Sequence, residues 1–126
     1  LEKTSKLLKD KEVIFSSKGF ENLVADDKGV FYYLDPPYRP ISKTSSFTDY
    51  TKSSFNDKTQ FALKEYCDKI DKKGSFFMQS NSYSEDGFFQ KLYHNRKINN
   101  LKVMRTISAD GNKRNKVKEI IIRNYV

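Results

Sequence analysis

A chain of 126 residues forms one domain at most, with a core large enough to fold and little room for a second site. Its 24 Lys and Arg residues outnumber its 16 Asp and Glu residues, and the net charge of +8 favours a polyanionic partner, with nucleic acid as the leading candidate. A single cysteine excludes an internal disulfide, and no apolar stretch approaches the roughly 20 residues that cross a bilayer, so we expect a cytoplasmic protein without a membrane partner.

The first part of the chain predicts short elements separated by turns. Residues 1–10 fit the end of a helix, and residues 12–15 fit a short buried strand. A short helix is expected at 20–24, and an apolar strand at 30–34 follows it. The segment 42–54 is rich in Ser, Thr and Lys, which is typical of a long loop.

A long helix is expected between Asn56, a suitable N-cap, and Gly74, a suitable stop after Lys72-Lys73. One apolar stripe runs along it: Ala62, Leu63, Tyr66, Cys67 and Ile70. A second buried strand is predicted at 75–80. Two strands joined through a helix form a right-handed crossover in nearly all cases, so the strands 30–34 and 75–80 should be parallel neighbours.

The last third of the chain predicts a helix at 85–94 and two antiparallel strands at 101–107 and 117–123. Asp110-Gly111, between these two strands, is a dipeptide typical of hairpin turns. The tip of this hairpin is strongly basic. The whole pattern indicates an α/β domain with a mixed sheet and a C-terminal β-hairpin.

Asp35-Pro36-Pro37-Tyr38 directly follows the strand 30–34. Ligands of open α/β sheets bind outside the carboxyl ends of the strands, so the predicted topology brings these residues beside Ser80-Asn81-Ser82 at one such edge. The prolines have fixed φ and no N–H, which keeps the carbonyls of Asp35 and Pro36 out of the sheet ladder. Free acceptors beside a carboxylate suit a substrate with an amino group.

Two basic segments are candidate phosphate contacts, although charged runs are often only solvated surface. In the first, Arg39, Lys43 and Lys52 alternate with Phe47, Tyr50 and Phe55, and for Phe55 we favour a packing role. In the second, the hairpin tip, the basic residues are Lys113, Arg114 and Lys116. His94 has no suitably spaced partners, so no metal site is expected, and Cys67 lies on the apolar stripe.

The chain resembles the catalytic half of Dam-type (D12 class) adenine-N6-specific DNA methyltransferases over about nine tenths of its length. The resemblance depends on an ordered series, which is far more specific than a lone Asp-Pro-Pro-Tyr. The matching residues are Asp35-Pro36-Pro37-Tyr38, Phe47, Tyr50, Phe55, Gln60, Leu63, Gly74, Phe76, Ser80-Asn81-Ser82, Arg105, Ile107, Ser108, Arg114, Glu119 and Asn124-Tyr125.

This resemblance implies a partial Rossmann-like class I S-adenosylmethionine-dependent methyltransferase fold and methyl transfer to N6 of an adenine flipped out of double-stranded DNA. It implies catalytic roles for residues 35–38, cofactor contacts by Phe20, Asp35 and Pro36, and a base-stacking role for Tyr38. Ser80, Asn81 and Ser82 are expected at the rim of the pocket, in contact with the flipped base or the adjacent DNA backbone. Where family members often have Asp-Phe at the cofactor's adenine, this chain has Gly19-Phe20, which removes a side-chain acceptor. A cytoplasmic enzyme of bacterial or phage origin is expected.

The resemblance also predicts that residues 1–126 are a segment of a methyltransferase domain. The family's Gly- and Phe-containing cofactor loop and its target-recognition segment have no counterpart here, so this segment alone should not methylate DNA. The strand 12–15 would correspond to the family's third strand. The strand 30–34 would lack its usual neighbour, the family's first strand, and should therefore be an open apolar edge or borrow a partner from the missing N-terminal half.

Two other functions remain open from the sequence. One is a methyltransferase that acts on another nitrogen, such as N4 of cytosine or a glutamine side chain, although such enzymes more often carry Asn or Ser in place of Asp35. The other is a basic nucleic-acid-binding module that keeps the motif as a relic. Loss of cofactor affinity with retained DNA affinity would favour the module.

Overall fold

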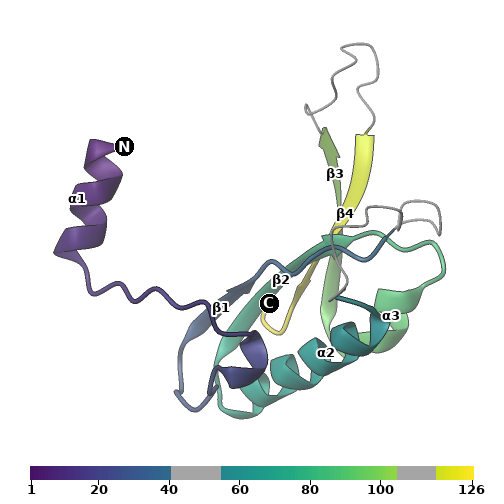
Figure 1. Cartoon of the computed structure of the whole chain (residues 1–126). Coiled ribbons are helices and arrows are strands. Elements are labelled where there is room, and N and C mark those ends of the chain that lie inside the picture. Colours follow the sequence, from purple (N-terminus) through teal and green to yellow (C-terminus); the bar gives the residue numbers. More distant parts are fainter. Residues whose placement is uncertain (41–54, 105–115) are drawn as a thin grey trace.

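The computed structural model describes residues 1–40, 55–104 and 116–126. In these ranges the four strands form one mixed sheet in the order β1-β2-β4-β3 (Figure 1). The elements, in chain order, are α1 (Glu2–Asp10), the 3-10 turn η1 (Phe20–Asn22), β1 (Phe31–Leu34), α2 (Asp57–Lys72), β2 (Phe76–Ser82), α3 (Phe88–Leu92), β3 (Lys97–Met104) and β4 (Lys116–Arg123).

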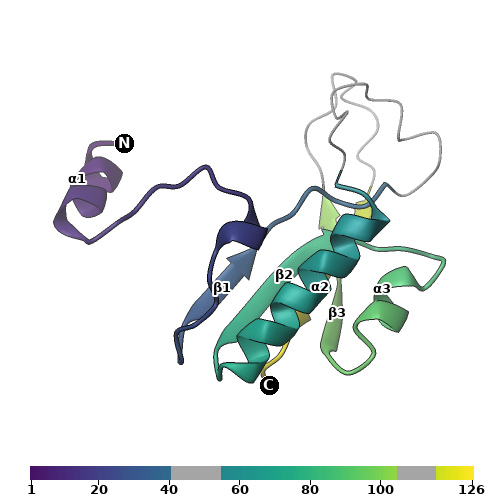
Figure 2. The ribbon, with the colours of Figure 1, turned by 60° about the horizontal axis from the view of Figure 1, so that its bottom comes forward.

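The predicted strand-helix-strand unit is confirmed. β1 and β2 are parallel neighbours, with Phe31 opposite Phe76, and α2 connects them (Figure 2). At the start of α2 the side chain of Asn56 accepts a hydrogen bond from the Thr59 N–H at 3.0 Å, which satisfies a donor of the first turn. At its end Gly74 has φ +75°, a left-handed conformation that glycine adopts without strain, and this turns the chain into β2.

α2 and α3 cover one face of the sheet and enclose the core with it. The buried apolar residues are Ala25, Leu63, Tyr66, Cys67, Ile70, Phe77, Phe89, Tyr93, Ile120 and Ile122. Within this core the Tyr93 hydroxyl donates to Gln79 Oε1 at 2.8 Å. Burial raises the pKa of the Cys67 thiol to about 12, which leaves it protonated and unreactive. Cys67 thus packs in the core, in agreement with its place on the predicted apolar stripe.

The opposite face of the sheet is partly open to solvent near β1. Phe31 and Tyr33 are 54% and 61% exposed, and Phe76 of β2 is 46% exposed. Tyr125 packs against the rings of Phe31 and Phe76, with centroid distances of 6.1 Å to both. β1 is at the end of the strand order, so the predicted open apolar edge is confirmed.

The predicted buried strand at 12–15 is wrong. These residues form no helix or strand in the described chain, and Ile14 and Phe15 are 85% and 80% exposed. The composition is suitable for a strand, but a strand needs a hydrogen-bonded neighbour, and the four described strands pair with one another only. Apolar sequence alone was therefore not sufficient to form this element.

Two boundaries in the second half also differ from the prediction. The helix expected at 85–94 is the shorter α3, because Gly87 is left-handed (φ +71°) and the Asp86 carboxylate accepts from the Phe88 N–H at 3.0 Å. β3 begins at Lys97 rather than at residue 101, since pairing with β4 extends the strand through the polar residues Asn99 and Asn100. The antiparallel pair is confirmed, and its basic tip lies outside the described residues.

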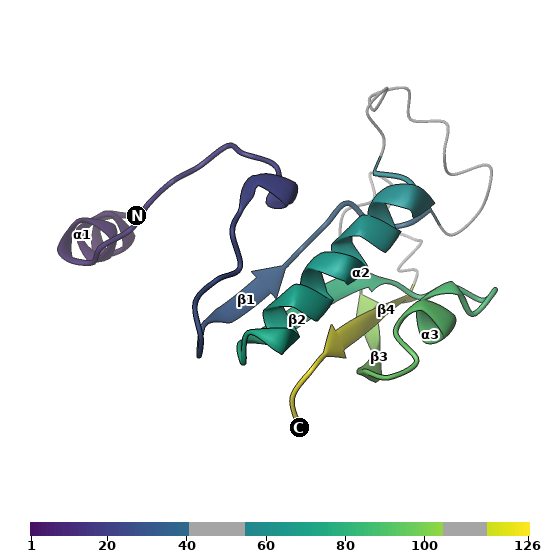
Figure 3. The ribbon, with the colours of Figure 1, turned by 90° about the horizontal axis from the view of Figure 1, so that it is seen from below.

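α1 stands away from the sheet (Figures 1 and 3), and none of its residues is buried. The helix expected in residues 1–10 is confirmed, but it contributes nothing to the core. Among the described helices, none has both the length and the apolar character needed to span a bilayer.

Candidate active site

The Asp-Pro-Pro-Tyr segment leaves the carboxyl end of β1 and runs past the end of β2 towards the start of α2 (Figure 3). Asp35 is exposed, and its Oδ1 accepts a hydrogen bond from the Ser80 hydroxyl at 2.8 Å. Its second carboxylate oxygen has no hydrogen-bond partner among the described residues. The predicted juxtaposition of Asp35 with the end of β2 is therefore confirmed, and one oxygen remains available to a ligand.

The side chains of Ser80, Asn81 and Ser82 are buried beneath this segment. Asn81 Oδ1 accepts from the Arg39 N–H at 3.0 Å, and the Ser82 hydroxyl donates to the Arg39 carbonyl. Gln60 of α2 reaches the Pro37 carbonyl through its Nε2 at 3.5 Å. These contacts hold the backbone of residues 35–39 against β2. The expected contacts of residues 80–82 with the base or DNA stay predictions, since the polar groups described here face the segment itself.

Tyr38 reaches across the end of β2 to β4. Its hydroxyl donates to Glu119 Oε2 at 3.3 Å. Burial raises the pKa of Tyr38, and the negative charges of Glu119 and Asp35 raise it further, whereas a hydrogen bond with Ser80 lowers it. The phenol is therefore protonated at neutral pH and available as a donor. Glu119 matches the family series, but no role follows for it from the sequence, because it lies 81 positions from Tyr38.

Arg39 takes part in a network within the protein. Its Nε donates to Asp57 Oδ1 at 2.7 Å and its Nη2 to Asp57 Oδ2 at 3.1 Å, which is a two-point contact with the first turn of α2. Its Nη1 donates to Asp86 at 2.8 Å, and its guanidinium stacks 4.2 Å from the centroid of the Phe88 ring. A contact between Arg39 and DNA phosphate stays a prediction, and these contacts argue against it because they occupy the guanidinium.

Phe20 lies in η1 and packs on aromatic side chains near α2. Its ring centroid is 5.7 Å from that of Tyr66 and 6.1 Å from that of Phe55. The Tyr66 hydroxyl is buried and has no hydrogen-bond partner among the described residues. Phe55 thus has the packing contact expected of it, and Phe20 lies beside a buried polar atom that a ligand could satisfy.

Four predicted DNA contacts, Lys43, Tyr50, Lys113 and Arg114, lie outside the described residues, as do Phe47 and Lys52. Within residues 1–40, 55–104 and 116–126, no group of three or more His, Cys, Asp or Glu side chains is arranged to hold a metal ion.

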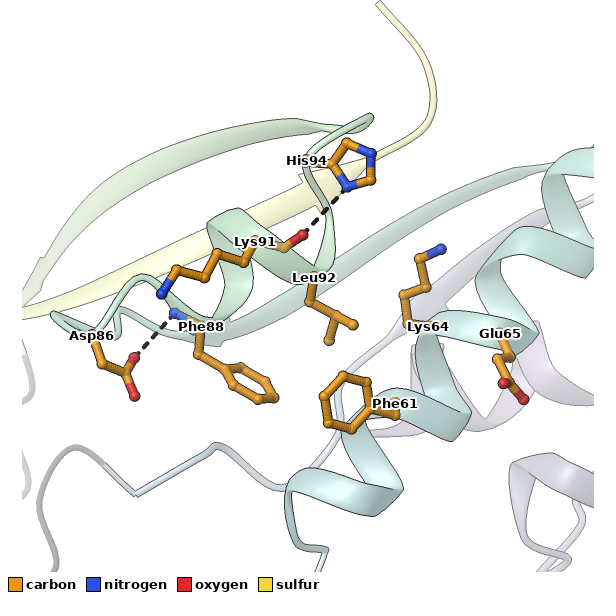
Figure 4. A pocket seen from close by; sticks show the side chains of 8 residues that line it. All are labelled: Phe61, Lys64, Glu65, Asp86, Phe88, Lys91, Leu92 and His94. Carbon is orange, nitrogen blue, oxygen red and sulfur yellow. Dashed lines mark hydrogen bonds between the residues drawn. The ribbon is translucent and has the colours of Figure 1, made fainter.

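A pocket of about 670 Å³ lies between α2 and α3 on the helical side of the molecule (Figure 4). Phe61, Phe88 and Leu92 form its apolar wall. The remaining lining residues are Lys64, Glu65, Asp86, Lys91 and His94. None of residues 35–38 lines it, so this hollow is separate from the Asp35 site. His94 contacts only the Lys91 carbonyl among its described polar neighbours.

Comparison with known proteins identifies the family of the chain. Residues 1–107 match the family model described as D12 class N6 adenine-specific DNA methyltransferase. The type II methyltransferase M.MjaIII of Methanocaldococcus jannaschii is 42% identical over 126 residues, which cover 99% of this chain and 43% of the relative.

Two bacterial relatives agree with this match. The type II methyltransferase M1.LlaDCHI of Lactococcus lactis subsp. cremoris is 37% identical over 99% of this chain and 44% of its own length. The DNA adenine methylase of Haemophilus influenzae is 34% identical over 75% of this chain and 33% of its own length. The chain thus spans less than half the length of these curated relatives. By the match of its residues 1–107, the chain belongs to the D12 class of N6 adenine-specific DNA methyltransferases.

Proposed function

We propose that this chain is the catalytic part of an enzyme that transfers a methyl group from S-adenosylmethionine to N6 of an adenine in double-stranded DNA. The observation that carries the proposal is the exposed Asp35 carboxylate, which Ser80 fixes through one oxygen at the carboxyl end of β1. Membership of the D12 class and the similarity to relatives named DNA adenine methylase support it. A prokaryotic cytoplasm, where such DNA is accessible, is the proposed location.

Asp35 has a specific task in this reaction. The adenine amino group is a poor nucleophile because its nitrogen lone pair is delocalised into the ring. The Asp35 carboxylate and the Pro36 carbonyl each accept a hydrogen bond from one N–H of this amino group. These two hydrogen bonds draw the nitrogen towards a tetrahedral geometry and localise its lone pair. The nitrogen would then attack the methyl carbon of S-adenosylmethionine in line, so that the N–C bond forms as the S–C bond breaks. S-adenosylhomocysteine would leave with the electron pair on its sulfur, and the proton shed by the methylated nitrogen would pass to water. Positioning and electrostatic stabilisation carry such a step.

Tyr38 supplies a stacking surface for the target base. Extruding a base from a duplex costs a few kcal/mol. Stacking on an aromatic side chain returns roughly 1–3 kcal/mol, so one tyrosine offsets a large part of that cost. Pro37 keeps the chain extended between Asp35 and Tyr38 and so fixes their spacing. Lys43, Tyr50, Lys113 and Arg114 remain proposed contacts with the DNA.

The residues at this edge fit S-adenosylmethionine. Phe20 would contact its adenine, beside the Tyr66 hydroxyl, which has no hydrogen-bond partner in the described part of the chain, and Asp35 and Pro36 would face its charged end. When bound, the cofactor supplies an electrophilic methyl group on a positively charged sulfur. The negative charge of Asp35 complements that positive charge.

We also propose that the four-stranded sheet is part of a class I methyltransferase fold. In that fold β1 would have a further strand on its open side, contributed by a part of the domain that this chain lacks, in line with the longer length of the relatives. The half-exposed Phe31 and Tyr33 on that edge support this proposal. The partner of this segment is then a polypeptide that carries the remaining strands and the cofactor loop, in the same or a second chain.

Replacing Asp35 tests the function. In the longest natural polypeptide that carries this chain, Asp35→Ala should lower methyl transfer from radiolabelled S-adenosylmethionine to unmethylated duplex DNA by at least about 10²-fold, the loss typical of one preorganised polar group. DNA affinity, measured by gel shift, should stay within about twofold because Asp35 is not a phosphate contact.

The matched control is Asp26→Ala, since Asp26 is exposed and its described ion pair is with Lys73, away from this edge. This variant should keep full activity. Retained turnover in Asp35→Ala would contradict the assigned role, and absence of any methyl transfer by the unaltered protein would contradict the function itself.

A further inference from the structure

The open face of the sheet brings two carboxylates to one edge. Along β4, Ile120 and Ile122 are fully buried under the helices, so Glu119 projects from the opposite face. Glu119 is directly opposite Ser82 in the register of β2 and β4. Asp35 lies on the same open face, because it continues the alternation of the exposed residues on β1.

β2 separates these two carboxylates. Neighbouring strands are about 4.8 Å apart, so β1 and β4 are about 10 Å apart across β2. Tyr38 crosses this distance: its backbone follows β1, and its hydroxyl meets Glu119 on β4 at 3.3 Å. Its ring consequently lies over the end of β2, next to the Ser80 that holds Asp35.

We infer that Glu119 is a positioning residue, whose carboxylate holds the Tyr38 ring in the orientation in which it stacks on the extruded adenine. The inference rests on the proposed function and extends it to a residue on another strand. A tyrosine side chain rotates about two bonds, and a hydrogen bond at its tip restricts both. The backbone on either side of Tyr38 is fixed as well, by Gln60 at the Pro37 carbonyl and by Asn81 at the Arg39 N–H.

A ring that is ordered before the base arrives loses no freedom when the base stacks on it. The raised pKa of Tyr38, which burial causes first and the charges of Glu119 and Asp35 increase, keeps its proton in place for this contact. In this role Glu119 acts through the ring and needs no contact with the base. Removing the Glu119 carboxylate should therefore cost no more than removing the Tyr38 hydroxyl, which also meets Ser80, and removing both should add nothing to the loss from the hydroxyl alone.

A double-mutant cycle tests this coupling with Glu119→Gln, Tyr38→Phe and the combined variant. Each single variant should lower kcat about five- to tenfold, the range expected when one side chain must be ordered during binding. The combined variant should match Tyr38→Phe, and the KM for DNA should change less than about twofold because phosphate contacts are retained. Glu65→Gln, an exposed change on α2, is the matched control and should behave as the unaltered protein.

A second measurement does not depend on methyl transfer. With ¹³C-labelled tyrosine, the NMR titration of Tyr38, assigned by its disappearance in Tyr38→Phe, should move towards lower pH in Glu119→Gln and stay unchanged in Glu65→Gln. An unchanged titration, or losses of kcat that multiply in the combined variant, would overturn the inference. If the unaltered protein transfers no methyl group, the proposed function fails, and the titration still decides whether Glu119 holds Tyr38.

Discussion

Replacing Asn81 with alanine should destabilise the protein strongly, because this side chain connects the catalytic segment to the sheet. Asn81 is fully buried, and its Oδ1 accepts from the N–H groups of Arg39 at 3.0 Å and Ser82 at 2.9 Å. Its Nδ2 donates to Gln60 Oε1 at 3.4 Å. Alanine offers none of these groups, so three polar atoms lose a partner at once.

The magnitude follows from the two shorter bonds. A buried donor that loses its partner costs about 1–3 kcal/mol. The contact with Gln60 is long and adds little, and water can reach the partly buried Arg39 N–H, so we expect a total loss of about 2–4 kcal/mol. A residue that only touched substrate from a pocket rim would show no such loss.

Urea unfolding measures this loss. The chain contains no tryptophan, so the transition is best followed by far-UV circular dichroism. Asn99→Ala is the matched control, because Asn99 is exposed on β3 and should change the unfolding free energy by less than about 0.5 kcal/mol. Equal stabilities of the Asn81 and Asn99 variants would refute the proposed connection between this segment and β2.

Two further predictions concern stability elsewhere in the chain. Phe15→Ser should leave the unfolding free energy, measured in urea, within about 0.5 kcal/mol of the parent, because Phe15 is exposed. Phe77→Ala should cost about 3–5 kcal/mol, because Phe77 is buried. A similar loss in both variants would instead indicate a buried strand at 12–15. Burial tends to raise the pKa of Asp68, but hydrogen bonds and charges from Lys64 and Arg96 outweigh it and lower that pKa below 3.8. The stability from Asp68 is therefore fully present well above pH 3.8 and is lost as the pH falls below 3.8 through the lowered pKa. The unfolding free energy should decrease less steeply with falling pH in Asp68→Asn than in the parent. An identical pH dependence in the two proteins would show that these ion pairs contribute nothing to stability.

Much of the architecture was predictable because several local signals agreed. The apolar stripe of α2, its cap at Asn56 and the stop at Gly74 predicted one helix between two apolar strands. The handedness of such units then predicts that Asp35 lies beside Ser80. Every step depended on short-range chemistry and one general rule of topology.

Long-range contacts were not predictable in the same way. Nothing in the local sequence distinguishes Glu119 as the partner of Tyr38, since that contact depends on the position of β4 in the sheet. Arg39 has the sequence signature of a phosphate contact, yet the fold surrounds it with Asp57 and Asp86. The segment 12–15 has the composition of a strand but no neighbour with which to pair.

The two-point contact of Arg39 with Asp57 has a practical consequence for protein engineering. It joins positions 18 residues apart and so holds together the two ends of the segment between them. The entropy of closing a loop rises slowly with length, by about 0.6 kcal/mol per doubling. Changes between residues 41 and 54 should therefore leave Asp35 in register with Ser80. Because the proposed DNA contacts Lys43 and Tyr50 lie in this segment, it is a suitable position for chimaeras that exchange DNA contacts and keep the catalytic segment.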